Sequence, residues 1–348
     1  MIPTYNRARL LFEAVDSALS QDYPNLEVIV SDNASTDDTS EVIKKYLPDT
    51  RFRYSRNQTN IGLGANWRKL LYEHATGEYG KLLNDDDYLI DKNHISKAVC
   101  LLRRHRLNAV FSGSKIIREK DVADEHFVNE IVFDLPPVVA RDWWIANLGK
   151  YQQQIVLFPN LAGGAVFGLK KARQLNAFSP GVYGLDYELA LKLILSGDTG
   201  YLQGHHWAER HHDSDGNTAS FAKAYEGTEL FERVYDYGIS LGLNKKSLVK
   251  LKLRALSIFI QVFVVGKWTS EKGVSLKSLC SLSKKIYETD PRVLWPTIIA
   301  VPTISELLKA KNERLHSLLR KLYRLNKRTP GKQKAGCAQP ARDPKPSG

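Results

Sequence analysis

The chain has 348 residues, 43% of them hydrophobic, which is enough to build a packed core in one large domain or two smaller ones. Its three cysteines form no CxxC pair, so neither a disulfide framework nor a zinc site is indicated, and a reducing cytosol fits best. Residues 244–348 carry 23 Lys and Arg against 6 Asp and Glu, whereas residues 1–243 carry 27 against 32. The acidic first part argues against a nucleic-acid-binding core, and the basic end favours polyanions or an anionic membrane surface.

The first 90 residues alternate between helical and strand patterns. In chain order, "ARLLFEAVDSALSQ" predicts a helix, "LEVIVSD" a strand, "STDDTSEVIKKYL" a helix that Ser35 or Thr36 could cap, "RFRYSR" a strand, "GANWRKLLYEHA" a helix and "YGKLL" a strand. This alternation predicts an α/β fold with a parallel sheet flanked by helices. Ligands of such sheets bind beyond the carboxyl ends of the strands, so we expect Asp32, at the end of the first of these strands, and Asp85 to Asp87, after the last, to share one crevice.

After residue 90 the pattern is less regular. "NAVFSGSKII" predicts a strand, "GGAVFGLKKARQL" a strand and a helix, and "GVYGLDYELALKLILSG" a loop followed by a helix. From residue 221 the chain is expected to be helical, and residues 329–348, rich in Pro, Gly and charge, to be disordered. We therefore divide the chain into a first domain at 1–220, a helical basic region at 221–328 and a tail at 329–348.

Three adjacent aspartates, Asp85, Asp86 and Asp87, follow the strand "YGKLL". Carboxylates in contact repel one another, so such a cluster requires a positive partner unless it is simply a solvated acidic turn.

Four segments appear in a specific order: "IPTYNR" at 2–7, "VIVSDNASTDDT" at 28–39, "LLNDDDYL" at 82–89 and "GLDYELALKL" at 184–193. Over residues 1 to about 215 their order and spacing resemble the inverting glycosyltransferases of family 2, which have the GT-A fold. Asn60, Gly62 and Asn66 ahead of "NDDDYL" resemble the subset that attaches sugars during surface polysaccharide or O-antigen assembly. The resemblance implies a Rossmann-like, mostly parallel sheet followed here by helices. It also implies sugar transfer from a nucleotide-diphosphate sugar to a glycan or lipid-linked acceptor.

The resemblance also implies a donor-binding site. Pro3, Thr4 and Tyr5 would form the nucleotide wall, with Tyr5 packing on the base, and Asp32 would contact base and ribose. Asn33 stands where the family usually has a second acid; Asn60 and Asp85 complete the expected set. The simpler alternative for Asp32 is that it caps the next helix.

A diphosphate leaving group implies a divalent cation, Mg²⁺ or Mn²⁺, held by hard oxygen ligands. The family's two metal-binding acids align with Asn84 and Asp86, and because an amide ligates weakly, Asp85 or Asp87 is expected to contribute. In the family the histidine-rich stretch at 205–220 is a loop over the donor. His211 is therefore a candidate for contact with the metal or diphosphate, whereas most of the other histidines are expected on the loop surface.

Asp186 aligns with the family's catalytic base, which takes the proton of the acceptor hydroxyl. The alternatives are that it only caps the following helix, or that Glu188, about 200° around that helix, is the base.

Two features depart from the family or lie outside it. The strand ahead of "IPTYN" is nearly absent, which indicates either translation from an upstream start or a compromised copy. The stretch "ALSIFIQVFVVG" at 255–266 is too short to span a bilayer, and with the amphipathic segment at 305–327 it predicts a peripheral protein at the cytoplasmic face of the membrane. Two other functions compete with sugar transfer. One is a non-catalytic relative or membrane adaptor. The other is a sugar nucleotidyltransferase, which usually has a Gly-rich phosphate loop that "IPTYNRARLL" lacks.

Overall fold

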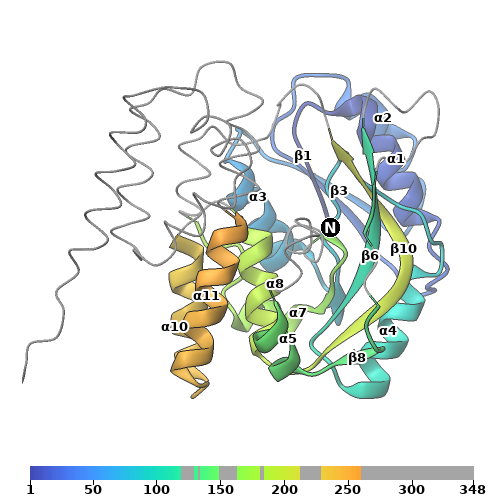
Figure 1. Ribbon diagram of the computed structural model, residues 1–348. Helices are drawn as coiled ribbons and strands as arrows, with labels where there is room; N and C mark the ends of the chain where they lie inside the picture. The colour runs from blue at the N-terminus through green and yellow to red at the C-terminus, as the bar shows by residue number, and fades with distance from the viewer. Residues whose placement is uncertain (119–128, 132–133, 149–162, 181–183, 212–228, 260–348) are drawn as a thin grey trace, which may run out of the picture. The chain divides into compact units, whose positions relative to one another are not determined.

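The computed structural model describes residues 1–118, 129–131, 134–148, 163–180, 184–211 and 229–259 (Figure 1). The chain divides into two compact units, residues 1–284 and 285–348, and every described residue belongs to the first. The predicted amphipathic segment at 305–327 and the tail at 329–348 therefore lie outside the described residues.

The first three strands form a parallel sheet in the order β1 (Ile2–Thr4), β2 (Val28–Asp32) and β3 (Phe52–Arg56). The apolar face of helix α1 (Ala8–Leu19) packs on this sheet, where Leu11 and Val15 are fully buried beside Val30. The parallel sheet and the flanking helix predicted for this part are confirmed, because apolar residues at helical spacing need such a surface to cover them.

A second sheet has the order β4-β9-β6-β10-β5, with β7 on β6 and β8 on β10. Its strands are β4 (Tyr79–Gly80), β5 (Tyr88–Leu89), β6 (Ala109–Arg118), β7 (Asn129–Ile131), β8 (Val138–Val139), β9 (Val166–Gly168) and β10 (Thr199–His211). Only β6 and β10 pair in parallel; the other pairings are antiparallel. The sheet is therefore mixed, and the long pairing between β6 and β10 is its centre.

The segment that follows β4 connects the two sheets. The Met1 ammonium group donates to the Lys81 carbonyl at 3.0 Å, and the Leu83 N–H donates to the Met1 carbonyl at 3.0 Å. The predicted strand "YGKLL" is thus regular only over its first two residues, yet residues 81–83 still run beside β1 and place the aspartates that follow at the carboxyl end of β1.

Helices cover these sheets and form a separate group beyond them (Figure 1). The remaining helices are α2 (Thr39–Lys44), α3 (Leu63–Lys69) with a π-helical turn η1 (Leu70–His74), α4 (His94–His105), α5 (Arg141–Asn147), α7 (Leu169–Gln174), α8 (Leu185–Leu195), α10 (Glu229–Ser240) and α11 (Lys245–Phe259). Helix α10 packs on α8 and α11 on α5, where the Arg254 guanidinium donates to the Ala146 carbonyl at 3.0 Å. Within the described residues no helix is both long and apolar enough to cross a bilayer.

One local expectation is wrong. Helix α2 begins at Thr39, so neither Ser35 nor Thr36 caps it. Both residues instead bind the loop after β1: the Ser35 hydroxyl accepts the Asn6 N–H at 2.9 Å, and the Thr36 N–H donates to the Asn6 side chain at 2.7 Å. Capping residues that find a partner elsewhere leave the helix to start one turn later.

Candidate functional site

The three aspartates form a closed turn at the edge of the sheet. The Asp87 N–H donates to the Asn84 carbonyl at 3.2 Å, and the Asn84 Nδ2 donates to the Asp87 carboxylate at 3.0 Å. Asp85 and Asp87 are buried, whereas Asp86 is partly exposed. Asn84 therefore fixes the shape of the turn through its Nδ2, and only its amide oxygen is left to offer to a metal ion.

Two arginines from distant parts of the chain compensate this turn. The Arg7 guanidinium forms an ion pair with Asp86 and lies 3.7 Å from the Asp85 carboxylate. From β10, the Arg210 backbone N–H donates to Asp87 at 3.0 Å, and its Nε donates to the Asp86 carbonyl at 3.2 Å. The Arg210 guanidinium also binds Glu13 of α1 at 2.6 Å, so this arginine fastens the turn to both β10 and α1.

The two arginines do not fully compensate the negative charge of the turn. Burial, with Asp86 adding to it, raises the pKa of Asp85 to about 7, although Arg7 acts in the opposite direction. Burial, together with Asp86 and Glu209, raises the pKa of Asp87 well above its usual value. Ionised carboxylates at such positions are destabilised unless another cation lies beside them. A divalent ion would neutralise their charge.

The donor atoms of the turn fit Mg²⁺ or Mn²⁺ that arrives with phosphate groups. Within the described residues no group of three or more His, Cys, Asp or Glu side chains is arranged to hold a metal ion by itself. Magnesium in nucleotide sites commonly takes only one or two protein carboxylates, with phosphate oxygens and water as its other ligands. Asp86 and Asp85 could supply that smaller set.

Asp32 ends β2 and is completely buried. Its Oδ1 accepts the Ser35 N–H at 2.8 Å, and its Oδ2 accepts the Tyr54 hydroxyl at 2.7 Å and the Arg56 guanidinium at 3.1 Å. Asp32 therefore closes the turn at 32–35 and is not the cap of α2, which begins seven residues later. Tyr54 and Arg56 of β3, which the sequence did not indicate, belong to the same site.

An asparagine network supports the loop after β3. Asn33 donates to the Asn60 side chain at 2.7 Å and accepts from Asn57 at 3.1 Å. Asn57 also donates to Asn66 of α3 at 3.0 Å, and Asn66 in turn accepts the Ser31 hydroxyl at 2.6 Å. Replacing the usual acid by Asn33 thus allows a neutral hydrogen-bond network to form, in which Asn57 was not expected.

Residues 3–5 connect Asp32 with the acidic turn. Thr4 pairs with Asp32 across the β1–β2 ladder, and the Tyr5 N–H approaches the Asp85 carboxylate at 3.4 Å. Pro3 and Thr4 are buried, but the Tyr5 side chain is 44% exposed. The carboxyl ends of neighbouring strands thus bring Asp32, Tyr5 and Asp85 to the same edge, with an aromatic ring open to a ligand.

Asp186 and Glu188 have different surroundings. Asp186 lies in the first turn of α8, partly exposed, and accepts the Tyr187 N–H at 3.0 Å; the N-cap is Gly184, so Asp186 is not the cap. Burial of its carboxyl group raises the pKa of Asp186 to about 6, and Glu209 adds to the effect. Glu188 is buried in an ion pair with Lys192 and lies 3.8 Å from Arg233 of α10, so it stabilises the packing of α8.

The histidine-rich stretch is a strand over its first seven residues. Residues 205–211 belong to β10, and His206 is buried with its Nδ1 2.8 Å from the Asp91 carboxylate. The expectation of surface-loop histidines is therefore wrong for His206, because β10 pairs with β6 on one side and β5 on the other. His211 ends β10, and its side chain lies outside the described residues. The negative charge of Glu209 in the same strand, which the sequence did not indicate, helps to raise the pKa of both Asp87 and Asp186.

Comparison with known proteins gives consistent matches. The family profile described as "Glycosyl transferase family 2" matches residues 1–166. The Escherichia coli protein WfaP, named UDP-Glc:alpha-D-GlcNAc-diphosphoundecaprenol beta-1,3-glucosyltransferase, is 31% identical over 197 residues, which are 57% of this chain and 70% of WfaP. The Staphylococcus aureus poly(ribitol-phosphate) beta-N-acetylglucosaminyltransferase TarS is 29% identical over 129 residues, which are 36% of this chain and 22% of TarS. The chain thus matches only about a fifth of the length of TarS.

The fold has a counterpart among solved structures. The crystal structure of Staphylococcus aureus TarS 1–349 in complex with UDP-GlcNAc superposes with a TM-score of 0.68 at 17% identity, covering 93% of this chain and 90% of that one. This likeness confirms the predicted α/β fold of the GT-A type.

The raised pKa of Asp85 predicts a pH-dependent stability without divalent cations. Because its folded pKa of about 7 exceeds the unfolded value, the stability from its protonated form is present below about pH 4 and lost as pH rises through 7. We expect Asp85→Asn to raise Tm in EDTA by on the order of 5 °C at pH 8, and by less at pH 5. Differential scanning fluorimetry at both pH values measures this.

Asp91→Asn is the matched control. Burial acts to raise the pKa of Asp91, but hydrogen bonds from Lys97, the Asn93 N–H and His206 outweigh it and lower the pKa to about 2. This carboxylate stabilises the fold at both pH 5 and pH 8, so its replacement should lower Tm at both. A lower Tm for Asp85→Asn at pH 8 would show that the acidic turn is not under electrostatic strain.

Proposed function

Because this chain belongs to glycosyl transferase family 2, we propose that it transfers a sugar, with inversion at the anomeric carbon, from a nucleotide-diphosphate sugar to a hydroxyl of a glycan acceptor. The observation that carries this proposal is the single edge of the sheet at which Asp32, Tyr5 and the acidic turn meet. Two relatives support a lipid-linked acceptor in cell-surface polysaccharide synthesis, since WfaP and a Campylobacter jejuni glucosyltransferase that is 33% identical over 143 residues (37% of this chain, 46% of that protein) both have undecaprenol in their names. The family membership favours this reaction over nucleotidyl transfer.

In this proposal the carboxyl ends of β1 and β2 bind the nucleotide. The exposed ring of Tyr5 stacks on the base. Asp32 is completely buried with both carboxylate oxygens bound, so it contacts the base and ribose by exchanging Tyr54 or Arg56 for the ligand. Pro3 and Thr4 form the wall, and the network of Asn33 and Asn60 fixes the loop beside it.

The acidic turn holds the diphosphate through Mg²⁺ or Mn²⁺. Bound there, the ion neutralises the charge that develops on the leaving group. Asp86 and Asp85 provide carboxylate oxygens, Asn84 can add its amide oxygen, and Asp87 keeps the turn closed. Arg7 forms an ion pair with Asp86, so the arginine and the metal ion have to share this carboxylate.

Asp186 is the general base. An inverting displacement needs one carboxylate to remove the acceptor proton on the face of the sugar opposite the leaving nucleotide. Asp186 has a raised pKa, and Lys192 and Arg233 pair with Glu188. A carboxylate left basic near neutral pH suits proton abstraction, whereas one in an ion pair does not.

Nucleotide binding should require a divalent cation. Calorimetry with UDP, GDP and CDP, each in Mn²⁺ and in EDTA, should show at least about tenfold tighter binding of the cognate nucleotide with the metal. Asp86→Ala should abolish this difference, because it removes the exposed ligand of the turn, and Asp91→Asn should retain it. Equal affinities in Mn²⁺ and EDTA would remove the metal from the proposal.

Replacement of the base should separate binding from transfer. Asp186→Asn keeps the shape of the side chain, so donor affinity should persist while turnover falls on the order of a thousandfold. In the unaltered enzyme, kcat should drop as pH falls through about 6, because protonated Asp186 cannot accept a proton. These measurements need a screen of nucleotide-sugars against lipid-linked acceptors.

Glu188→Gln is the control for this experiment. It should lower stability by breaking the ion pair with Lys192 but leave the pH profile of kcat unchanged. Normal transfer by Asp186→Asn, or a pH profile altered only by Glu188→Gln, would assign the base to Glu188.

We further propose that the basic end attaches the enzyme to the cytoplasmic face of the membrane, where lipid-linked acceptors lie. Residues 260–348, outside the described part of the chain, carry 18 Lys and Arg against 6 Asp and Glu. Each basic residue near an anionic leaflet adds about 1 kcal/mol of attraction. The helices α10 and α11 pack on α8 and α5, so the attachment is assigned to the residues that follow them.

The full chain should co-sediment with phosphatidylglycerol vesicles at low salt and be released as salt shortens the range of its charges. Neutral phosphatidylcholine vesicles are the control. Removal of residues 260–348 should weaken sedimentation while nucleotide binding persists. No preference for anionic over neutral vesicles would contradict the membrane attachment.

A further inference from the structure

The side chain of Arg7 reaches both of the carboxylates that could bind a metal ion. Its Nη1 atom forms the ion pair with Asp86 and lies 3.7 Å from the Asp85 carboxylate, so one nitrogen faces both groups at once. All three side chains are 15% exposed or less, so water solvates their charges poorly. A divalent ion that binds both carboxylates has to come to the same place. Arg7 and a metal ion therefore compete for one position.

The backbone on both sides of Arg7 is held in place. Asn6 has a φ of 52°, in the left-handed region that asparagine tolerates, and its N–H donates to the Ser35 hydroxyl at 2.9 Å. On the other side the Ala8 N–H donates to the Asp37 carboxylate at 2.9 Å. The segment after β2 thus fixes the main chain, and a change of partner by Arg7 requires only rotation of its long side chain.

A nucleotide diphosphate offers Arg7 a second partner. Arg7 follows Tyr5, whose exposed ring is the proposed contact of the base, by two residues, and it already touches Asp86, the proposed contact of the metal. A diphosphate that connects the base with the metal therefore passes beside Arg7. Guanidinium groups bind phosphate oxygens in a bidentate fashion, so this contact can replace the ion pair with the turn.

The charges predict how the two ligands affect each other. A divalent ion alone would displace Arg7 from the turn and leave two positive groups close together, which costs energy. A diphosphate removes this cost because its negative charge compensates both groups. Metal and nucleotide should therefore strengthen each other's binding, and linkage requires that they do so by the same factor.

We propose that Arg7 occupies the cation position of the acidic turn in the free protein and moves to the diphosphate when metal and nucleotide bind together. This inference rests on the metal-dependent nucleotide binding proposed above. It assigns the cooperativity between the two ligands to one side chain, which acts as a positioning residue for both.

Arg7→Gln tests this inference without an activity assay. Electron paramagnetic resonance measures free Mn²⁺, and calorimetry measures the affinity for UDP, GDP or CDP, whichever binds the unaltered protein most tightly. The variant should bind Mn²⁺ alone about tenfold more tightly, because the competitor is gone, and the nucleotide in Mn²⁺ about tenfold more weakly, because a phosphate contact is gone. A general loss of structure would not change the two affinities in opposite directions.

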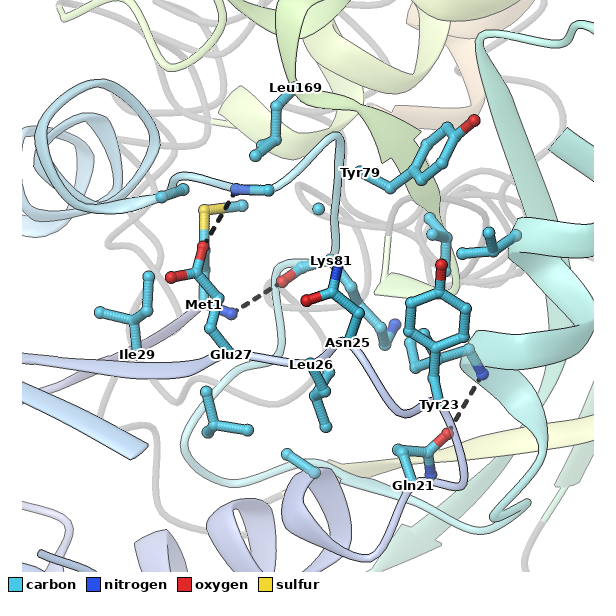
Figure 2. Close-up of a pocket in the computed structure, with 18 of the residues that line it drawn as sticks. Met1, Gln21, Tyr23, Asn25, Leu26, Glu27, Ile29, Tyr79, Lys81 and Leu169 are labelled. Carbon is cyan, nitrogen blue, oxygen red and sulfur yellow. Dashed lines mark hydrogen bonds between the residues drawn. The ribbon is translucent and has the colours of Figure 1, made fainter. Parts of the chain in front are cut away.

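Arg103→Gln is the matched control. Arg103 donates to Glu78 at 2.8 Å and packs over the ring of Tyr79. Figure 2 shows Tyr79 with Met1 and Lys81 around a cavity at the amino end of β1, whereas the acidic turn lies at the carboxyl end of this strand. This variant also removes one arginine from an ion pair, but both affinities should stay unchanged.

Arg7→Lys separates the charge from the shape of the side chain. Lysine keeps a cation beside the turn, so Mn²⁺ alone should bind as weakly as it does to the unaltered protein. It lacks the planar fork that matches phosphate, so nucleotide affinity in Mn²⁺ should still fall. Tighter binding of Mn²⁺ alone to Arg7→Lys would contradict the competition between two cations.

Two further results would overturn the inference, namely Mn²⁺ binding by Arg7→Gln that is no tighter than that of the unaltered protein, and nucleotide affinity that this variant retains in full. If the unaltered protein nevertheless binds nucleotide more tightly in Mn²⁺ than in EDTA, only the role of Arg7 fails. Equal affinities of the unaltered protein in Mn²⁺ and EDTA would overturn both the metal site and this inference.

Discussion

Three adjacent carboxylates can remain at the edge of a sheet only if cationic groups reach them, and most of the site follows from this requirement. Arg7 arrives from the loop after β1, and Arg210 from β10. Because Arg210 also binds Glu13, compensation of the turn fixes α1 and β10 in place. The pKa values of Asp85 and Asp87 nevertheless stay raised, so the compensation is incomplete. A turn of this kind is stable enough to fold and still suits the divalent ion that we propose for it.

Two carboxylates of helix α8 differ in the charges that surround them. Asp186 and Glu188 both lie in the first turn of α8, but their side chains have different surroundings. Cations from α8 and α10 surround Glu188, whereas the carboxylate of Glu209 acts on Asp186. This difference in basicity is the reason why we propose a structural role for Glu188 and proton transfer for Asp186. Helix α10 thus contributes to the site without touching it.

The sequence predicts the elements better than the contacts between them. Apolar periodicity is a local signal, so α1, β2, β3 and α8 could be placed, and so could the carboxyl-end position of Asp32. The partners of the acids could not. Arg210 is 123 residues from Asp87, and no local pattern carries the register that brings them together. The end of β10, "HHWAERH", has no alternating apolar pattern, and the pairing with strands on both sides that holds it is not visible in the sequence. The loop expected there was implied by the family resemblance.

The short strand β1 positions several residues of the site. Only three residue pairs hold it to β2, yet it positions Thr4 beside Asp32 and leads directly to Tyr5 and Arg7. The precision with which these side chains are held cannot exceed the precision of the strand that carries them.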